Sequence, residues 1–159
     1  MVIFMEQKLP HNTETSVSRQ LKIEECLLNN MNQVDYERIS VADMCRQMGI
    51  SRTLFYTYFP DKEACLHSLI DRMIRDSMLT LMKAPHTSLT QEELITHYLN
   101  YWKQNAAFLD AIRRQNMKGS LIDRCFLLLQ SSGDKFRDVL STPDVKADDN
   151  ILWLYAAVR

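Results

Sequence analysis

Apolar residues recur every three or four positions along most of this chain, as they do on the buried face of an α-helix. This pattern predicts a first helix from Ser18, a short helix over residues 41–48 and a long helix from Asp61 to just before Pro85. A further helix is predicted in LITHYLNYWKQ, which begins at a Thr90–Glu93 capping box and has a break or bend near Asn105. Another helix carries Phe108 and stops at Gly119. The last two of these predicted helices lie in LIDRCFLLLQ and over residues 134–140.

The two ends of the chain lack this amphipathic pattern. Residues 1–17 mix polar side chains with Pro10 and show no period, so we expect a mobile tail there. The last segment, NILWLYAAVR, is apolar on every side, and a helix of that kind must be buried. It stops at Arg159 without Gly, Asn or Pro, so we expect either a chain truncated at its C-terminus or burial by another subunit.

Composition supports an all-α protein, because 159 residues include only three glycines and four prolines for the tight turns of sheets. The net charge of −1 gives no bulk attraction to nucleic acid, so such a partner would need a local basic patch. No apolar run approaches the roughly 20 residues that span a bilayer, and no membrane partner is expected. The four cysteines lack C-x-x-C spacing, which predicts neither a zinc site nor a disulfide framework and favours a reducing cytoplasm.

Two short helices meet at a glycine in the stretch SVADMCRQMGISRTLFYTYFPDK. Ser40 and Asp43 form a capping box that begins the first of them. Gly49 takes the position where a left-handed residue ends a helix without strain, and Ser51 caps the second helix. This order predicts a helix-turn-helix in which Phe55 holds the second helix against the first and leaves its outer face for a partner.

The outer face of the second helix carries side chains suited to DNA. A helix fits the major groove, where Arg52 can donate to guanine, Thr53 can bond a base edge and Leu54 can touch a thymine methyl. Hydroxyl groups, helix starts and the ammonium of Lys62 favour phosphate oxygens, and Arg38 and Arg46 add local positive charge. The candidate DNA-binding residues are Ser40, Ser51, Arg52, Thr53, Leu54, Tyr56, Thr57, Tyr58 and Lys62.

The region from Ser18 to Leu69 resembles the TetR family of bacterial transcriptional regulators, of the TetR/AcrR-like kind. The segment LFYTYFPDKEACL is similar to the family's sequence at the end of its recognition helix, and the helix around KIEECLLNNM also matches. The matching positions are Val41, Asp43, Gly49, Ile50, Ser51, Phe55, Tyr56, Phe59, Lys62 and Leu66. Thr53 and Leu54 depart from the family's usual residues, so the operator sequence is not implied.

After the mobile tail over residues 1–17, the resemblance implies a three-helix helix-turn-helix DNA-binding domain over 18–62 and a helical ligand-binding and dimerisation domain over 63–159. It implies a one-component transcriptional repressor in the cytoplasm, associated with the nucleoid. Such a protein binds a palindromic double-stranded DNA operator as a homodimer through its C-terminal helices, and a small-molecule effector releases it. The long helix from Asp61 is the expected lever between the two domains.

Other interpretations of the same residues stay open. The helix pair could be a structural connection, and the chain could be a TetR-like interaction module or co-regulator that does not bind DNA. No catalytic set, metal site or cofactor site is predicted, because His97 has no second ligand at i+3 or i+4 and no phosphate loop occurs. Aromatic residues such as Tyr98 and Trp102 are compatible with an effector pocket but are predicted to be core, as are the cysteines.

Overall fold

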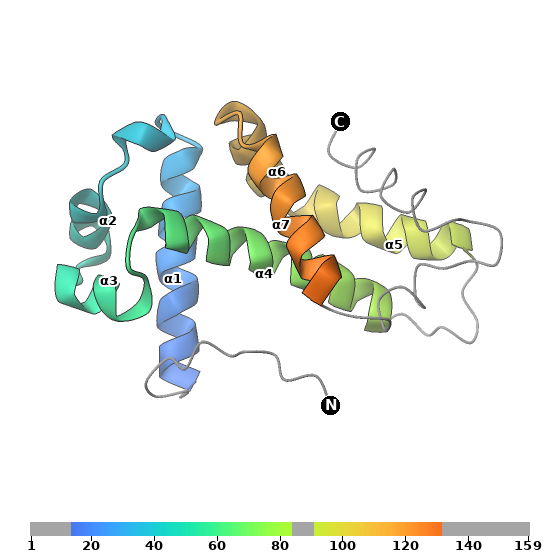
Figure 1. Ribbon diagram of the computed structural model, residues 1–159, viewed down its shortest axis with the longest axis horizontal. Helices are drawn as coiled ribbons and strands as arrows, with labels where there is room; N and C mark the ends of the chain where they lie inside the picture. The colour runs from blue at the N-terminus through green and yellow to red at the C-terminus, as the bar shows by residue number, and fades with distance from the viewer. Residues whose placement is uncertain (1–13, 84–90, 132–159) are drawn as a thin grey trace. The chain divides into compact units, whose positions relative to one another are not determined.

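A computed structural model of the chain describes residues 14–83 and 91–131 (Figure 1). These residues form seven α-helices and one short 3-10 helix, with no strand among them. In chain order the elements are α1 (Glu14–Met31), η1 (Tyr36–Arg38), α2 (Val41–Met48), α3 (Arg52–Tyr58), α4 (Lys62–Lys83), α5 (Gln91–Gln104), α6 (Ala106–Arg114) and α7 (Lys118–Ser131). The all-α fold class predicted from the sequence is confirmed.

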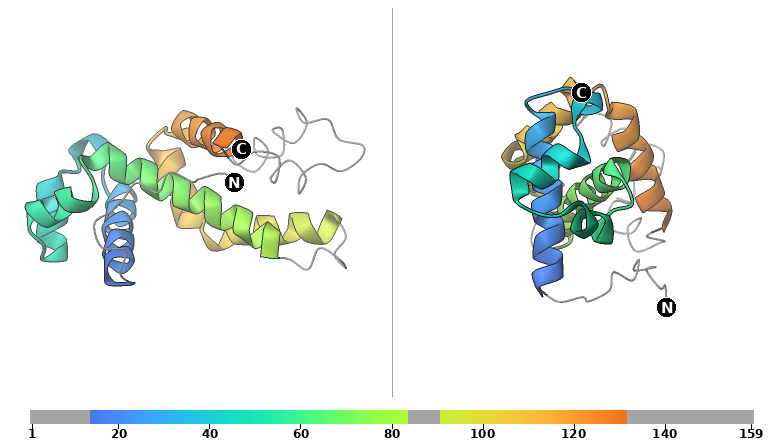
Figure 2. Two further views of the ribbon diagram at one scale, coloured as in Figure 1. Left: turned by 60° about the horizontal axis from the view of Figure 1, so that its bottom comes forward. Right: turned by 90° about the vertical axis from the view of Figure 1, so that its left-hand side faces the viewer.

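The helices group into two compact units that divide between Ser68 and Leu69, within α4. In the first unit α2 contacts both α1 and α3 (Figure 2). These helices, the first turns of α4 and the connecting residues bury one apolar core. The fully or almost fully buried side chains of this core are Ile23, Leu27, Met31, Ile39, Met44, Phe55, Phe59 and Leu66. Every element of the first unit contributes to this core except η1, so the short helices are stabilised by packing more than by helix propensity.

A buried polar network ties α1 to α4 inside the first unit. The side chain of Glu24 has no exposed surface and accepts hydrogen bonds from Ser68 Oγ at 2.7 Å and from Gln20 Nε2 at 3.2 Å. Gln20 Nε2 also lies 3.1 Å from Ser68 Oγ. Because a buried carboxylate without partners would be strongly destabilising, these hydrogen bonds fix the register between the two helices.

The first helix begins earlier than the apolar pattern indicates. The sequence predicts a start at Ser18, whereas α1 begins at Glu14, so the last residues of the segment assigned to a tail are helical. Ser16 is only 8% exposed and takes a core-facing position. A polar residue at such a position leaves no signal in a hydrophobic pattern, which is why the predicted start is too late.

The second unit packs α5, α6 and α7 with the greater part of α4. Its buried side chains include Trp102, Phe108, Ile112, Leu121 and Cys125, and the Trp102 and Phe108 rings stack with centroids 6.1 Å apart. The Tyr101 hydroxyl donates to the Met73 carbonyl at 3.1 Å, and the Arg124 guanidinium forms a paired contact with the Asp71 carboxylate. Aromatic packing and these polar contacts join the helices of this unit.

The boundaries within this unit match the sequence at one place and differ at another. The predicted break near Asn105 is confirmed, because α5 ends at Gln104 and α6 begins at Ala106. The predicted stop at Gly119 is wrong: α6 ends at Arg114, and Gly119 lies in the first turn of α7. The residue with the left-handed backbone is Asn116, at φ 54°, and asparagine tolerates this conformation better than other residues with a Cβ.

Several sequence predictions fall outside the described residues. They are the Thr90 cap, the helix over residues 134–140, and the burial of NILWLYAAVR. Within the described ranges, no helix combines the length and the apolar character needed to cross a membrane.

Candidate nucleic-acid interface

The first short helix begins at a cap that the sequence predicts. The Asp43 N–H donates to Ser40 Oγ at 3.0 Å, and the Ser40 hydroxyl donates to Asp43 Oδ2 at 2.6 Å. Arg46 Nη1 lies 2.8 Å from Asp43 Oδ1. The Ser40 hydrogen bond, followed by the Arg46 charge, holds the pKa of Asp43 below its usual value. A phosphate at the start of α2 would therefore meet backbone N–H groups, since the Ser40 hydrogen is already used by Asp43.

The turn between the two helices depends on Gly49. This residue has φ 66° and ψ 31°, the left-handed conformation, and its N–H donates to the Arg46 carbonyl. The next N–H, of Ile50, donates to the Cys45 carbonyl at 3.0 Å. No atom lies within 4 Å of the position that a Cβ on Gly49 would occupy, so glycine is required here by the backbone angle and not by crowding.

The second short helix, α3, is anchored on one side and exposed on the other. Its cap is Ser51, whose Oγ accepts the Leu54 N–H at 3.1 Å, and Phe55 is completely buried with its ring 5.9 Å from that of Phe59. The exposed residues of this region are Ser51, Arg52, Thr53, Tyr56 and Thr57, while Leu54 and Tyr58 are half-buried. Seven of the nine candidate DNA-binding residues therefore lie on α3 or at its cap, whereas Ser40 and Lys62 lie at the starts of α2 and α4.

The polar groups on α3 differ in how much of their hydrogen-bonding capacity is already used. The Thr57 hydroxyl donates to the Thr53 carbonyl at 3.0 Å, a common bond within a helix. Arg52 makes no hydrogen bond or ion pair within the described part of the chain. Its five N–H donors are thus available to a ligand.

Lys62 has a role that the sequence does not reveal. Its ammonium donates to the carbonyls of Tyr36 at 2.7 Å and of Ile39 at 2.9 Å, and lies 4.0 Å from the centre of the Tyr36 ring. Two of the three ammonium N–H groups are used by these carbonyls. Lys62 thus fastens η1 and the residue before Ser40 to the start of α4. The phosphate contact expected for Lys62 stays a prediction, with the third N–H as its donor.

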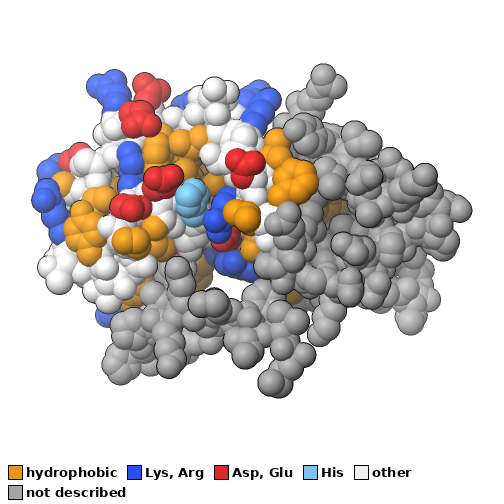
Figure 3. Space-filling model, viewed as in Figure 1, with side chains coloured by type: hydrophobic (Ala, Val, Ile, Leu, Met, Phe, Trp, Pro, Cys, Tyr) orange, Lys and Arg blue, Asp and Glu red, His pale blue; other side chains and the backbone are white. Residues whose placement is uncertain are grey.

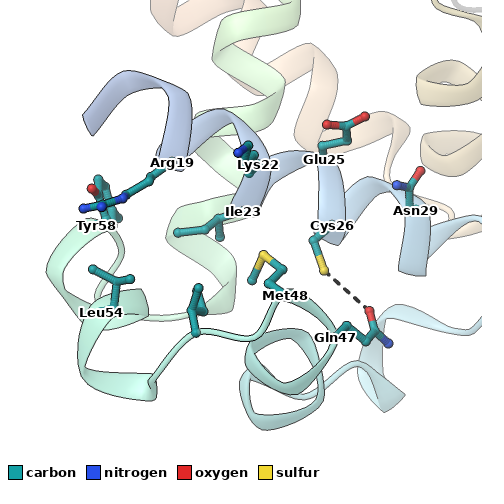
Figure 4. Close-up of a pocket in the computed structure, with 11 residues that line it drawn as sticks. Arg19, Lys22, Ile23, Glu25, Cys26, Asn29, Gln47, Met48, Leu54 and Tyr58 are labelled. Carbon is teal, nitrogen blue, oxygen red and sulfur yellow. Dashed lines mark hydrogen bonds between the residues drawn. The ribbon is translucent and has the colours of Figure 1, made fainter. Parts of the chain in front are cut away.

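A groove with a volume of about 360 Å³ lies between α1 and the helix-turn-helix (Figure 4). Its apolar lining includes Ile23, Met48, Ile50 and Leu54, and its polar lining includes Arg19, Lys22, Glu25, Cys26, Asn29, Gln47 and Tyr58. The sequence does not single out Arg19 or Lys22, because nothing in the local pattern of α1 shows that they lie beside α3. On the face drawn in Figure 3, basic and acidic side chains of the described residues are interspersed.

The cysteines pack as small apolar side chains. Cys45 and Cys65 are buried, and Cys26 is half-buried with its Sγ 3.5 Å from Gln47 Oε1. Burial raises the pKa of all three thiols, which suppresses the reactive thiolate. No group of three or more His, Cys, Asp or Glu side chains that could hold a metal ion occurs among the described residues.

The region around the two short helices is similar to known proteins. Residues 28–69 match the family model described as bacterial regulatory proteins, tetR family. The HTH-type transcriptional regulator EthR of Mycobacterium tuberculosis is 38% identical over 65 residues, which cover 41% of this chain and 28% of that protein. The EthR protein of Mycolicibacterium smegmatis is 55% identical over 40 residues, covering 25% of this chain and 18% of the relative.

The family-model match lies in the region whose geometry is described above. It runs from the end of α1 through α2 and α3 into α4, and so includes the capped short helices and the left-handed glycine of the first unit. The chain spans less than a third of the length of the curated relatives that it matches. Through residues 28–69 the chain is similar to the tetR family of bacterial regulatory proteins.

Proposed function

We propose that this chain is a one-component transcriptional regulator that binds a palindromic DNA operator as a homodimer and is released from it by a small-molecule effector. The observation that carries the proposal is the exposed face of α3. Phe55 anchors the helix in the core, whereas Arg52, Thr53, Tyr56 and Thr57 all face solvent. The EthR relatives are named as HTH-type transcriptional regulators, which supports a regulatory role for this chain.

The chemistry of that face suits the major groove. The groove of B-DNA is about 12 Å wide and admits one α-helix. Arg52 has its donors available and can bind guanine O6 and N7 together, while Thr53 can bond a base edge and Leu54 can contact a thymine methyl. The Tyr56 hydroxyl can bind a phosphate oxygen, which would set the orientation of α3 on the duplex.

Release by an effector requires that the ligand prefer a conformer with a different arrangement of the two recognition helices. The helix α4 supports this expectation, because it is continuous from Lys62 to Lys83 and contributes residues to both compact units. A homodimer would place two copies of α3 in successive major grooves, and a palindromic operator mirrors that symmetry.

The test begins with selection of duplexes from a random library by the full chain, because the operator is unidentified. Titration of the selected duplex with Arg52→Ala should then show an affinity lower by about 1–3 kcal/mol, or roughly 5- to 150-fold, if Arg52 binds a base. Arg75→Ala is the matched control, since Arg75 is exposed, lies in the second unit and has no partner in the described part of the chain. A chain that enriches no duplex, or an Arg52→Ala variant that binds like the control, would contradict the proposal.

A further inference from the structure

Two positively charged side chains of α1 lie beside α3. Arg19 and Lys22 line the groove from α1, and Leu54 and Tyr58 line it from α3 (Figure 4). Arg19 and Lys22 are exposed, and neither makes a hydrogen bond or ion pair with another residue in the described part of the chain. Their charges are therefore available to a partner that approaches α3.

The positions of Leu54 and Tyr58 fix the direction of this groove. Residues four apart lie on the same side of a helix, so the groove follows one flank of α3 along its length. An α-helix with its side chains is about 10–12 Å across, which nearly fills a major groove about 12 Å wide. A duplex that accepts α3 must therefore place a sugar-phosphate strand directly along each flank of the helix.

Two of the cations expected from sequence to lie near phosphate already have partners within the chain. Arg46 pairs with Asp43 at 2.8 Å, and the Lys62 ammonium donates to two backbone carbonyls. The electrostatic part of DNA binding depends on the number of phosphates that cations neutralise. The free side chains of Arg19 and Lys22 can neutralise phosphates that Arg46 and Lys62 do not.

We propose that Arg19 and Lys22 form a phosphate-binding edge on α1, in addition to the DNA contacts proposed for α3. This α1 edge binds the DNA strand that runs along the Leu54–Tyr58 flank of α3. The inference rests on the proposed DNA binding and adds a contact outside the helix-turn-helix itself. The groove between the α1 edge and the Leu54–Tyr58 flank of α3 has an apolar lining that includes Ile23 and Ile50. This apolar lining suits the carbon atoms of deoxyribose.

An acidic residue limits this edge at one end. Glu25 also lines the groove, and it lies three residues after Lys22 on α1. Figure 4 shows Arg19 at the Tyr58 end of the groove and Glu25 away from it, nearer Asn29. The carboxylate weakens the field at Lys22 more than at Arg19, so Arg19 should contribute more to phosphate binding.

The test measures binding of the full chain to a fluorescent 30-base-pair duplex of random sequence as a function of KCl concentration. The quantity compared is the steepness with which the logarithm of the association constant K falls as the logarithm of the salt concentration rises. Removing one cation that neutralises a phosphate lowers this slope by about 0.9. The same change reduces the affinity roughly fivefold near 0.15 M salt. The variant Arg19→Ala/Lys22→Ala should therefore reduce the slope by up to about two per bound protomer, with the larger share from Arg19→Ala alone.

Two further variants separate charge from structure. Arg75→Ala/Lys103→Ala removes the same charge from two exposed side chains of the second unit and should leave the slope unchanged. Arg19→Lys/Lys22→Arg keeps both charges on α1 and should retain the slope of the original chain. If Arg19→Ala/Lys22→Ala shows the same salt slope as Arg75→Ala/Lys103→Ala, the proposed α1 edge is wrong, but the proposed function is not affected. If the original chain binds no duplex at any salt concentration, both the α1 edge and the proposed function are wrong.

Discussion

Replacing Lys62 by methionine tests whether this residue fastens the start of α2 to the start of α4. Methionine keeps the apolar stem but removes the ammonium, and with it two hydrogen bonds of 2.7 and 2.9 Å and the contact with the Tyr36 ring. A hydrogen bond to a charged group contributes about 1.5 kcal/mol at the lower end of its range, and a solvent-accessible cation–π contact about 0.5 kcal/mol. Since water can hydrate the two freed carbonyls, we expect the free energy of unfolding to fall by about 2–3 kcal/mol.

Urea unfolding followed by circular dichroism measures this decrease. With a urea dependence of about 1–3 kcal/mol per molar, the midpoint of unfolding should fall by roughly 0.7–3 M. Lys103→Met is the matched control, because Lys103 is exposed and has no partner in the described part of the chain, so its free energy of unfolding should change by less than about 0.5 kcal/mol. An equal midpoint for Lys62→Met and Lys103→Met would refute the fastening role.

The salt dependence of DNA binding separates this role from a phosphate contact. If the remaining N–H of Lys62 binds a phosphate, Lys62→Met should also lower the slope of log K against log salt by about 0.9. If Lys62 acts only on η1 and α2, the affinity should fall while the slope stays the same.

The turn, the thiols and two tyrosines offer further tests. Gly49→Ala should lower the free energy of unfolding, measured by urea unfolding, by about 1–2 kcal/mol, because the backbone there has a positive φ. Gly49→Asn should lower it by less, since asparagine tolerates this conformation better. Equal decreases for the two variants would contradict the backbone explanation. In native-state alkylation at pH 8 followed by peptide mass mapping, Cys26 should react before Cys65, which is fully buried and whose pKa is raised by burial; equal rates would argue against a packed Cys65. Burial raises the pKa of Tyr98 and of Tyr101 to about 12 from a usual value of 10. The contribution of these two hydroxyl groups to the free energy of unfolding is therefore fully present below pH 10 and is lost as the pH rises from about 10 to 12. Melting temperatures between pH 9 and 11.5 should therefore fall less steeply in Tyr98→Phe than in the original chain. An unchanged pH dependence would contradict a raised pKa for the half-buried Tyr98.

Polar contacts between helices are the features that the sequence did not predict. The amides of Asn30 and Gln47 bond each other between α1 and α2, at 2.8 and 3.1 Å, although 17 positions separate them in the chain. The Lys62 contacts with Tyr36 and Ile39 span 26 and 23 positions. Hydrophobic periodicity reports which face of a helix is buried, but it carries no information on which polar side chains meet across helices.

The features that the sequence determined by itself are local ones. The caps at Ser40 and Ser51 and the left-handed turn at Gly49 each depend on residues within one helical turn, and on backbone preferences that hold in any fold. Only the tertiary structure decided that Lys62 turns inward and that Arg19 lies beside α3, because both depend on how α1 and α4 pack against the short helices. Short-range chemistry therefore predicted the shape of the recognition unit, while long-range packing determined which of its charges are free to bind.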